Sequence, residues 1–212
     1  MKTILAIIAA VWTVSAQAED MQKYLSDTAT MAQQGRHEEA LKRHIWFHGH
    51  CLEHNKAMYG VRLSYALGYW KELGEAYPPA KAALIETRDC KALVILNGQV
   101  NRELFHDVIS INKTLGDQEK SVSLFEKVDR NQPEAAKTYW DSAKDAVIDA
   151  KRYDLAQKYV GSAIQEYTKV RARYDMNVAL YDHPRIGGKR FKVYNENRLV
   201  EDSLKLIGVA LA

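Results

Sequence analysis

Hydrophobic residues recur at helical spacing in the stretch from Trp140 to Ala163. Ahead of a polar turn at residues 151–153, one helix face carries Trp140, Ala143 and Val147. Beyond the turn, the next face carries Leu155, Ala156, Tyr159, Val160 and Ala163. The small alanines allow two backbones to approach closely, and the aromatic rings fill the volume beside them. The pattern therefore predicts two short helices folded back on each other.

Three earlier segments repeat this layout, with turns at residues 35–37 in the first and 116–117 in the third. The second carries Tyr77, Ala80 and Leu84 around its second helix. At the equivalent place on each second helix stands a small residue: Ala40, Ala80, Ser121 and Ala156, which are 40, 41 and 35 positions apart. Val and Ile nowhere alternate with polar residues for long enough to indicate a sheet. We therefore expect an all-α fold.

An early Trp, an aromatic residue after the turn, and two alanines seven positions apart resemble a tetratricopeptide repeat. The resemblance extends over about residues 20–170, although Trp stands at its family place only in the fourth segment and Leu67-Gly68 only in the second. It implies an α-solenoid of antiparallel hairpins with degenerate repeats at about 24–55, 57–97, 102–133 and 137–180. The alternative is a helical bundle about one central core. Two spacings exceed the family period of about 34, which implies longer helices or insertions near 51–59 and 90–99.

Residues 195–212 read as a capping helix for this array. Its apolar stripe consists of Leu199, Val200, Ser203, Leu204, Ile207 and Leu211. A stack of hairpins needs such a cap, because the last hairpin cannot otherwise cover its apolar face. Pro184 and Gly187-Gly188 predict a loop between the array and the cap.

The beginning of the chain has the three parts of a secretory signal peptide. Lys2 is followed by an uncharged run over residues 4–14 and by an Ala16-Gln17-Ala18 ending, so we expect cleavage after Ala18. The product would keep 194 residues (212 minus 18) as one domain, 19–212, in the periplasm or outside the cell. Loss of Lys2 lowers the net charge from +3 to +2, which does not favour nucleic acid or a membrane surface. We expect no membrane span in the mature chain and make no prediction of oligomeric state.

The family resemblance also implies a concave groove lined by first helices. Carried over residue by residue, its positions are Arg62, Tyr65, Tyr69 and Glu72, then His106 and Lys113, then Asp141 and Asp145. Tyr and Arg are the residues that most often anchor interfaces. In this hypothesis the tyrosines anchor a peptide or protein, Arg62 and Lys113 hold its carboxylates, and the aspartates hold its basic groups. The alternative is a solvated helix face.

A histidine-rich stretch offers a second hypothesis. His44, His48 and Cys51 are spaced i, i+4 and i+7, so a helix would place them on one face, as a zinc or copper site requires. The alternative is a set of imidazoles packed at a hairpin end, because Trp46 and Phe47 indicate a packed surface. A periplasmic metal-binding protein is therefore the alternative function.

Cys51 and Cys90 are the only cysteines. If the repeats stack as the resemblance implies, both lie at the far end of second helices in consecutive repeats, and an exported protein can join them in a disulfide. Two separate thiols are the alternative. The sequence contains no G-x-S-x-G motif and no loop-borne cluster of carboxylates. We therefore expect a binding module without a cofactor and not an enzyme.

Overall fold

The structure is a computed structural model that describes residues 21–212, so the predicted signal peptide lies outside the described residues. The chain divides into two compact units, one ending at Asp117 and the other beginning at Gln118. The division falls in the turn of the predicted third hairpin. Each unit is described by itself below, the first as unit 1 (residues 21–117) and the second as unit 2 (residues 118–212).

Unit 1 is entirely helical apart from its turns. A helix over residues 21–33 comes first. It is followed by α2 (His37–His54), the short 3-10 helix η1 (Lys56–Met58), α3 (Tyr59–Arg62), α4 (Tyr65–Ala76), α5 (Pro78–Leu96) and α6 (Arg102–Leu115). Local sequence sets several of these ends. The Asn101 side chain accepts hydrogen bonds from the first turn of α6, and Gly116 ends that helix with a φ of 80°.

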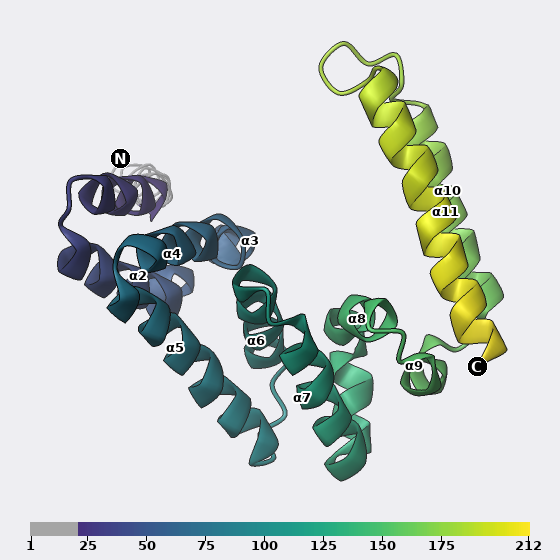
Figure 1. Ribbon diagram of the computed structural model, residues 1–212, viewed down its shortest axis with the longest axis horizontal. Coiled ribbons are helices and arrows are strands. Elements are labelled where there is room, and N and C mark those ends of the chain that lie inside the picture. The colour runs from purple at the N-terminus through teal and green to yellow at the C-terminus, as the bar shows by residue number, and fades with distance from the viewer. Residues whose placement is uncertain (1–20) are drawn as a thin grey trace, which may run out of the picture. The chain divides into compact units, whose positions relative to one another are not determined.

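The helices of unit 1 pack on their neighbours in chain order (Figure 1). α2 packs on α4, α4 on α5, and α5 on α6, while α4 also contacts α6. Trp70 is buried between α4 and α5, and its indole N–H donates to the carbonyl of Ala80 at 2.9 Å. Gly74 permits the close approach of these two helices, because a Cβ there would lie 3.0 Å from the backbone nitrogen of Lys81.

Unit 2 contains α7 (Gln118–Asn131), α8 (Pro133–Asp149), α9 (Tyr153–Val160), α10 (Ala163–Val178) and α11 (Lys189–Leu211). α7 packs on α8 and α8 on α9. The rings of Phe125, Trp140 and Tyr159 lie against one another, with the centroids of Trp140 and Tyr159 5.4 Å apart. The helical pair predicted from this stretch is thus present as α8 and α9.

The last two helices form a long hairpin, drawn in yellow and green in Figure 1. The buried Asn195 side chain fixes their register by accepting from Asn177 at 3.0 Å and donating to the hydroxyl of Tyr181 at 2.9 Å. Gln157 of α9 donates to the carbonyl of Val209, which ties the hairpin to α9. No helix within residues 21–212 is long and apolar enough to cross a bilayer.

The all-α prediction is confirmed, and the described helices pack mostly on sequential neighbours. The turns predicted at residues 35–37, 116–117 and 151–153 are present, with positive φ at Gly35, Gly116 and Lys151. The four predicted small residues, Ala40, Ala80, Ser121 and Ala156, are all buried. The predicted extra length also exists, as η1 and α3 before α4 and as the 19-residue α5.

Two expectations about the second half of the chain were wrong. The predicted fourth repeat, residues 137–180, takes in three helices, because Gly161 ends α9 after 8 residues and α10 pairs with α11 instead. The stripe predicted to cap the array is not buried as a cap requires. Val200, Leu204, Ile207 and Leu211 are all exposed, because α11 turns its other side to α10.

Candidate functional site

The aromatic residues of α4 are one part of the predicted groove that is open to solvent. Tyr65 is 69% exposed and Tyr69 is 39% exposed, and Glu72 is exposed one turn further on. Gly68 lies on the same side of the helix, with nothing within 4 Å of the position its Cβ would occupy. Buried Leu67 and Trp70 hold the other side of α4 in the core, so this aromatic face is presented by a rigid element.

Arg62 does not belong to that face, and its predicted role as a carboxylate clamp for a partner was wrong. α3 ends at Arg62, and a break at residues 63–64 separates it from α4. The guanidinium is buried and donates to both carboxylate oxygens of Asp107, at 2.6 and 3.0 Å. It therefore already holds a carboxylate of its own chain.

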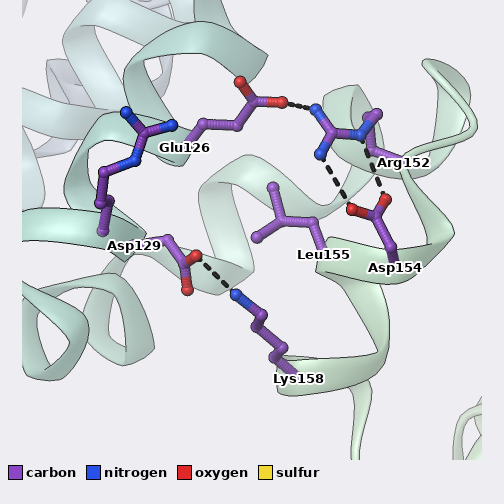
Figure 2. Close-up of a pocket in the computed structure, with 7 residues that line it drawn as sticks. Glu126, Asp129, Arg152, Asp154, Leu155 and Lys158 are labelled. Atoms are coloured by element: carbon purple, nitrogen blue, oxygen red, sulfur yellow. Dashed lines mark hydrogen bonds and ion pairs between the residues drawn. The ribbon is translucent and has the colours of Figure 1, made fainter.

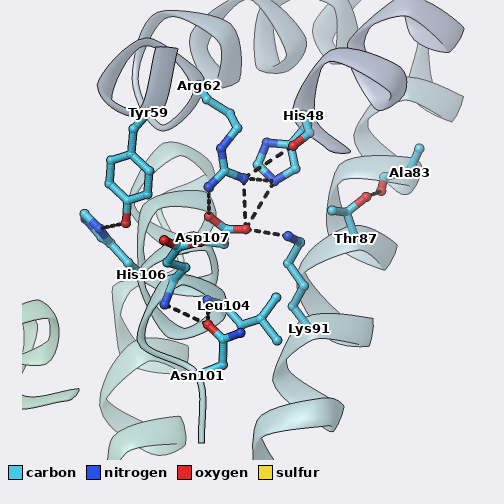
Figure 3. Close-up of polar contacts among 11 residues, drawn as sticks. His48, Tyr59, Arg62, Ala83, Thr87, Lys91, Asn101, Leu104, His106 and Asp107 are labelled. Atoms are coloured by element: carbon cyan, nitrogen blue, oxygen red, sulfur yellow. Dashed lines mark hydrogen bonds and ion pairs between the residues drawn. The ribbon is translucent and has the colours of Figure 1, made fainter. Parts of the chain in front are cut away.

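Asp107 is the centre of a buried polar cluster in unit 1, hereafter the Asp107 cluster (Figure 3). Lys91 of α5 bonds to the same carboxylate, and Nε2 of His48 lies 3.8 Å from it. Arg62 also donates to the backbone carbonyl of His48 at 3.4 Å. The cluster thus joins α2, α3, α5 and α6 through one side chain.

Burial and charge act in opposite directions on the cluster. Burial raises the pKa of Asp107, but hydrogen bonds from Arg62 and Lys91 outweigh it and leave the pKa lowered. Burial lowers the pKa of His48 to about 3, with Asp107 opposing and Arg62 contributing. Asp107 is therefore an anion and His48 a neutral imidazole near pH 7. The arrangement is a structural ion pair, in which Arg62 and Lys91 already neutralise the carboxylate of Asp107.

Asp107 was not among the predicted site residues, although its position in the sequence carried a clue. Leu104, Val108, Ile111 and Leu115 recur at helical spacing, and Asp107 falls on the same stripe. Lys91 likewise falls between Leu84 and Ile95 on α5. A charged residue on an apolar stripe predicts a buried partner.

The candidate metal ligands are not arranged as a metal site. His44 and His48 are both buried against Trp70, with ring centroids 6.0 Å from it in each case. Burial lowers the pKa of His44 to about 4. Within residues 21–212, no group of three or more His, Cys, Asp or Glu side chains is placed to hold a metal ion. The packed alternative accounts for these histidines.

The expected disulfide is absent. Cys51 is a buried free thiol and Cys90 an exposed one. Burial raises the pKa of Cys51 to about 11, with Arg62 opposing, so this sulfur stays protonated. It packs with Phe47, Met58 and Ala66 as a small hydrophobic residue.

The other predicted groove residues lie on α6 of the same unit or on α8 of the other unit. His106 is half-buried and hydrogen-bonded through Nδ1 to the Tyr59 hydroxyl at 2.8 Å, while Lys113 is exposed near the end of α6. Asp141 and Asp145 are exposed on α8, in unit 2. Of the predicted groove residues in unit 1, only Tyr65, Tyr69 and Glu72 share one exposed helix face.

Unit 2 has a hollow of about 400 Å³ between α7 and the beginning of α9 (Figure 2). Its lining residues are Glu126, Asp129, Arg130, Arg152, Asp154, Leu155 and Lys158. Lys158 pairs with Asp129 at 2.7 Å, and Arg152 pairs with Asp154 at 2.9 Å and with Glu126. The three acids and three bases balance, so the hollow has no net charge to attract an ionic ligand. It is a salt-bridged seam between helices.

Asp129 reaches beyond this seam to the aromatic cluster, because it accepts a hydrogen bond from the Tyr159 hydroxyl at 2.5 Å. Burial and this bond raise the pKa of Tyr159.

Comparison with protein-family models, curated proteins and solved structures finds no match to the chain.

Proposed function

We propose that the protein is an exported helical-repeat module, similar in plan to tetratricopeptide repeats, that binds a protein or peptide partner. Its contact surface is the aromatic face of α4, formed by Tyr65, Tyr69 and Glu72. Export follows from the apolar run at residues 4–14 and the Ala16-Gln17-Ala18 ending.

The packing of unit 1 supports a repeat plan. α4 contacts α6, two helices further on, as well as its partner α5. First helices of successive hairpins make such contacts when hairpins stack. The buried small residues Ala40 and Ala80 lie on α2 and α5, where two second helices of such an array would need close packing.

The single observation that carries the proposed surface is the exposure of Tyr65. Tyr65 and Tyr69, one turn apart, together leave an aromatic surface on one helix face that the domain itself does not cover. Tyrosine anchors interfaces because it brings a large apolar ring and a hydroxyl at a low cost in conformational entropy. Glu72 beside the rings favours a partner that carries a basic group.

Site-specific cross-linking tests this surface. The chain would carry a photoreactive benzoylphenylalanine at position 69 or, as a control, at position 93, where exposed Leu93 lies on α5. After irradiation in an extract of the producing cells, we expect a discrete product from position 69 that position 93 does not give. Tyr65→Ala should reduce that product at least about tenfold, because a lost hot-spot tyrosine costs about 2 kcal/mol of binding. Equal products from both positions would remove the proposal.

A further inference from the structure

α11 carries an apolar stripe that unit 2 leaves uncovered. Its residues are Val193, Asn197, Val200, Leu204, Ile207 and Leu211, hereafter the outer stripe. The five apolar side chains are between 45% and 81% exposed, and Asn197 is also exposed. The opposite side of the helix, with buried Asn195 and Val209, packs on α10 and α9.

The spacing of the outer stripe indicates what shape of partner fits it. Successive members are 4, 3, 4, 3 and 4 residues apart. This alternation is the a and d pattern of a coiled coil, with Asn197 at an a position. It matches another helix that lies along α11 at a shallow angle, since only such a partner meets every member of the stripe.

We propose that the outer stripe packs against the outer stripe of a second copy of this chain. The stripe is complementary to itself about Asp202. In an antiparallel pair Val200 lies opposite Leu204 of the second copy, Val193 opposite Leu211, and Asn197 opposite Ile207. A surface that matches itself under a two-fold rotation is the surface of an isologous dimer.

Charges beside the stripe favour the antiparallel arrangement. In a parallel pair Glu196 would face Glu201 of the second copy, and this repulsion would occur twice. In the antiparallel pair the two Glu201 side chains approach each other once. Each is already paired with Lys205 of its own helix at 2.6 Å, which reduces the repulsion.

The area of the stripe is sufficient for a dimer of moderate affinity. Five half-exposed to mostly exposed aliphatic side chains offer about 100 Å² each, or about 1,000 Å² for the pair of copies. Specific interfaces begin at about this size. We therefore expect a dissociation constant on the order of micromolar.

Sedimentation equilibrium of the mature chain tests the proposal. Leu204→Glu should weaken dimerisation at least about 100-fold, because it places a charge in the apolar seam from both copies. Leu93→Glu is the matched control, since Leu93 is 59% exposed and Leu204 61% exposed, and it should leave the dissociation constant unchanged. Asn197→Leu should tighten the dimer about tenfold by completing the stripe. A chain that stays monomeric at about 200 μM, or equal effects of the two glutamate variants, would overturn the proposal.

Cross-linking determines the orientation of the two helices. In a Cys90→Ser background, a mixture of Val193→Cys and Leu211→Cys chains should form a mixed disulfide, because the antiparallel pair brings these positions together. A disulfide of Val193→Cys with itself would support the second copy and reverse its direction. With neither bond under oxidising conditions, the stripe is not the contact.

Discussion

At the scale of single residues, Asp107 determines which substitutions unit 1 tolerates in its buried polar cluster. One buried carboxylate is bonded to Arg62 and Lys91, which reach it from α3 and α5. Breaking a buried ion pair costs more than the pair contributes, because the remaining charge has no solvent around it. The same pair, removed as a whole, is replaceable by apolar side chains.

Asp107→Asn should therefore lower the free energy of unfolding by about 3 kcal/mol, since it leaves Arg62 buried without an anion. Urea denaturation measures the change. The control is Glu75→Gln, which breaks an exposed pair with Lys71 and should cost less than about 0.5 kcal/mol. The double variant Arg62→Met, Asp107→Leu should recover most of the loss. If Asp107→Asn unfolds like the unchanged protein, the cluster is not a structural ion pair.

At the scale of elements, a glycine allows two helices to approach closely only where it faces the neighbouring helix. The sequence does not show which glycines face a helix and which face solvent. The Leu67-Gly68 pair resembled the family motif, yet Gly68 is open to solvent and Gly74 is the glycine against a neighbouring helix. Periodicity located the helices and their turns because it depends on chain-local spacing. Arg62 has helical spacing to Tyr65, but the helix breaks at residues 63–64. Arg62 is therefore not on the face of Tyr65, and it pairs with Asp107, which is distant in sequence.

The same limit explains α11. The sequence showed an apolar stripe through Val200 and Leu204, and the stripe exists, but it cannot show which of two faces of a helix is covered. Which face of α11 is covered depends on the helix that packs alongside it, and α10 packs on the face that carries Asn195. Contacts distant in sequence therefore account for most of what the sequence reading missed.

Glycine-to-alanine substitutions in α4 separate these two kinds of position. Gly68→Ala should stabilise the protein by up to about 1 kcal/mol, because alanine favours the helix and meets nothing. Gly74→Ala should instead destabilise it by about 1–2 kcal/mol, because its Cβ presses on the backbone of Lys81. Thermal and urea denaturation of the two variants provide the comparison. Stabilisation by Gly74→Ala would mean that α4 and α5 are not as close as described.

At the scale of the whole molecule, the acid-sensitive groups are unevenly divided between the units. His44 and His48 are buried in unit 1, with pKa values lowered to about 4 and about 3. The only histidine of unit 2, His183, is exposed in the turn before α11. A histidine whose pKa is lowered by folding binds its proton only in the unfolded chain between its two pKa values, so acid destabilises unit 1 selectively.

The sign of the pH dependence of stability follows from the folded and unfolded pKa values of each imidazole. Below pH 6.5 the imidazoles of His44 and His48 become protonated in the unfolded chain but stay neutral in the native protein. The stability of unit 1 therefore falls as the pH drops below 6.5. The contribution of His44 levels off at about pH 4 and that of His48 at about pH 3. The facing groups of His48 are Arg62, Lys91 and Asp107. Asp107, with its lowered pKa, contributes stability that is lost only at lower pH. At pH 5 each histidine should cost about 2 kcal/mol relative to pH 7.

The tryptophans report the two units separately in the mature chain, since Trp46 and Trp70 lie in unit 1 and Trp140 in unit 2. In a Trp140→Phe variant, the urea midpoint read by fluorescence should fall steeply from pH 7 to pH 5. In a Trp46→Phe, Trp70→Phe variant, the midpoint read from Trp140 should move far less. His48→Gln should reduce the pH dependence of unit 1 and leave that of unit 2 unchanged. Because the two units are compact by themselves, acid should thus loosen the unit that presents Tyr65 and Tyr69 while the α10–α11 hairpin stays folded. Equal shifts of both reporters would instead mean that the units unfold as one.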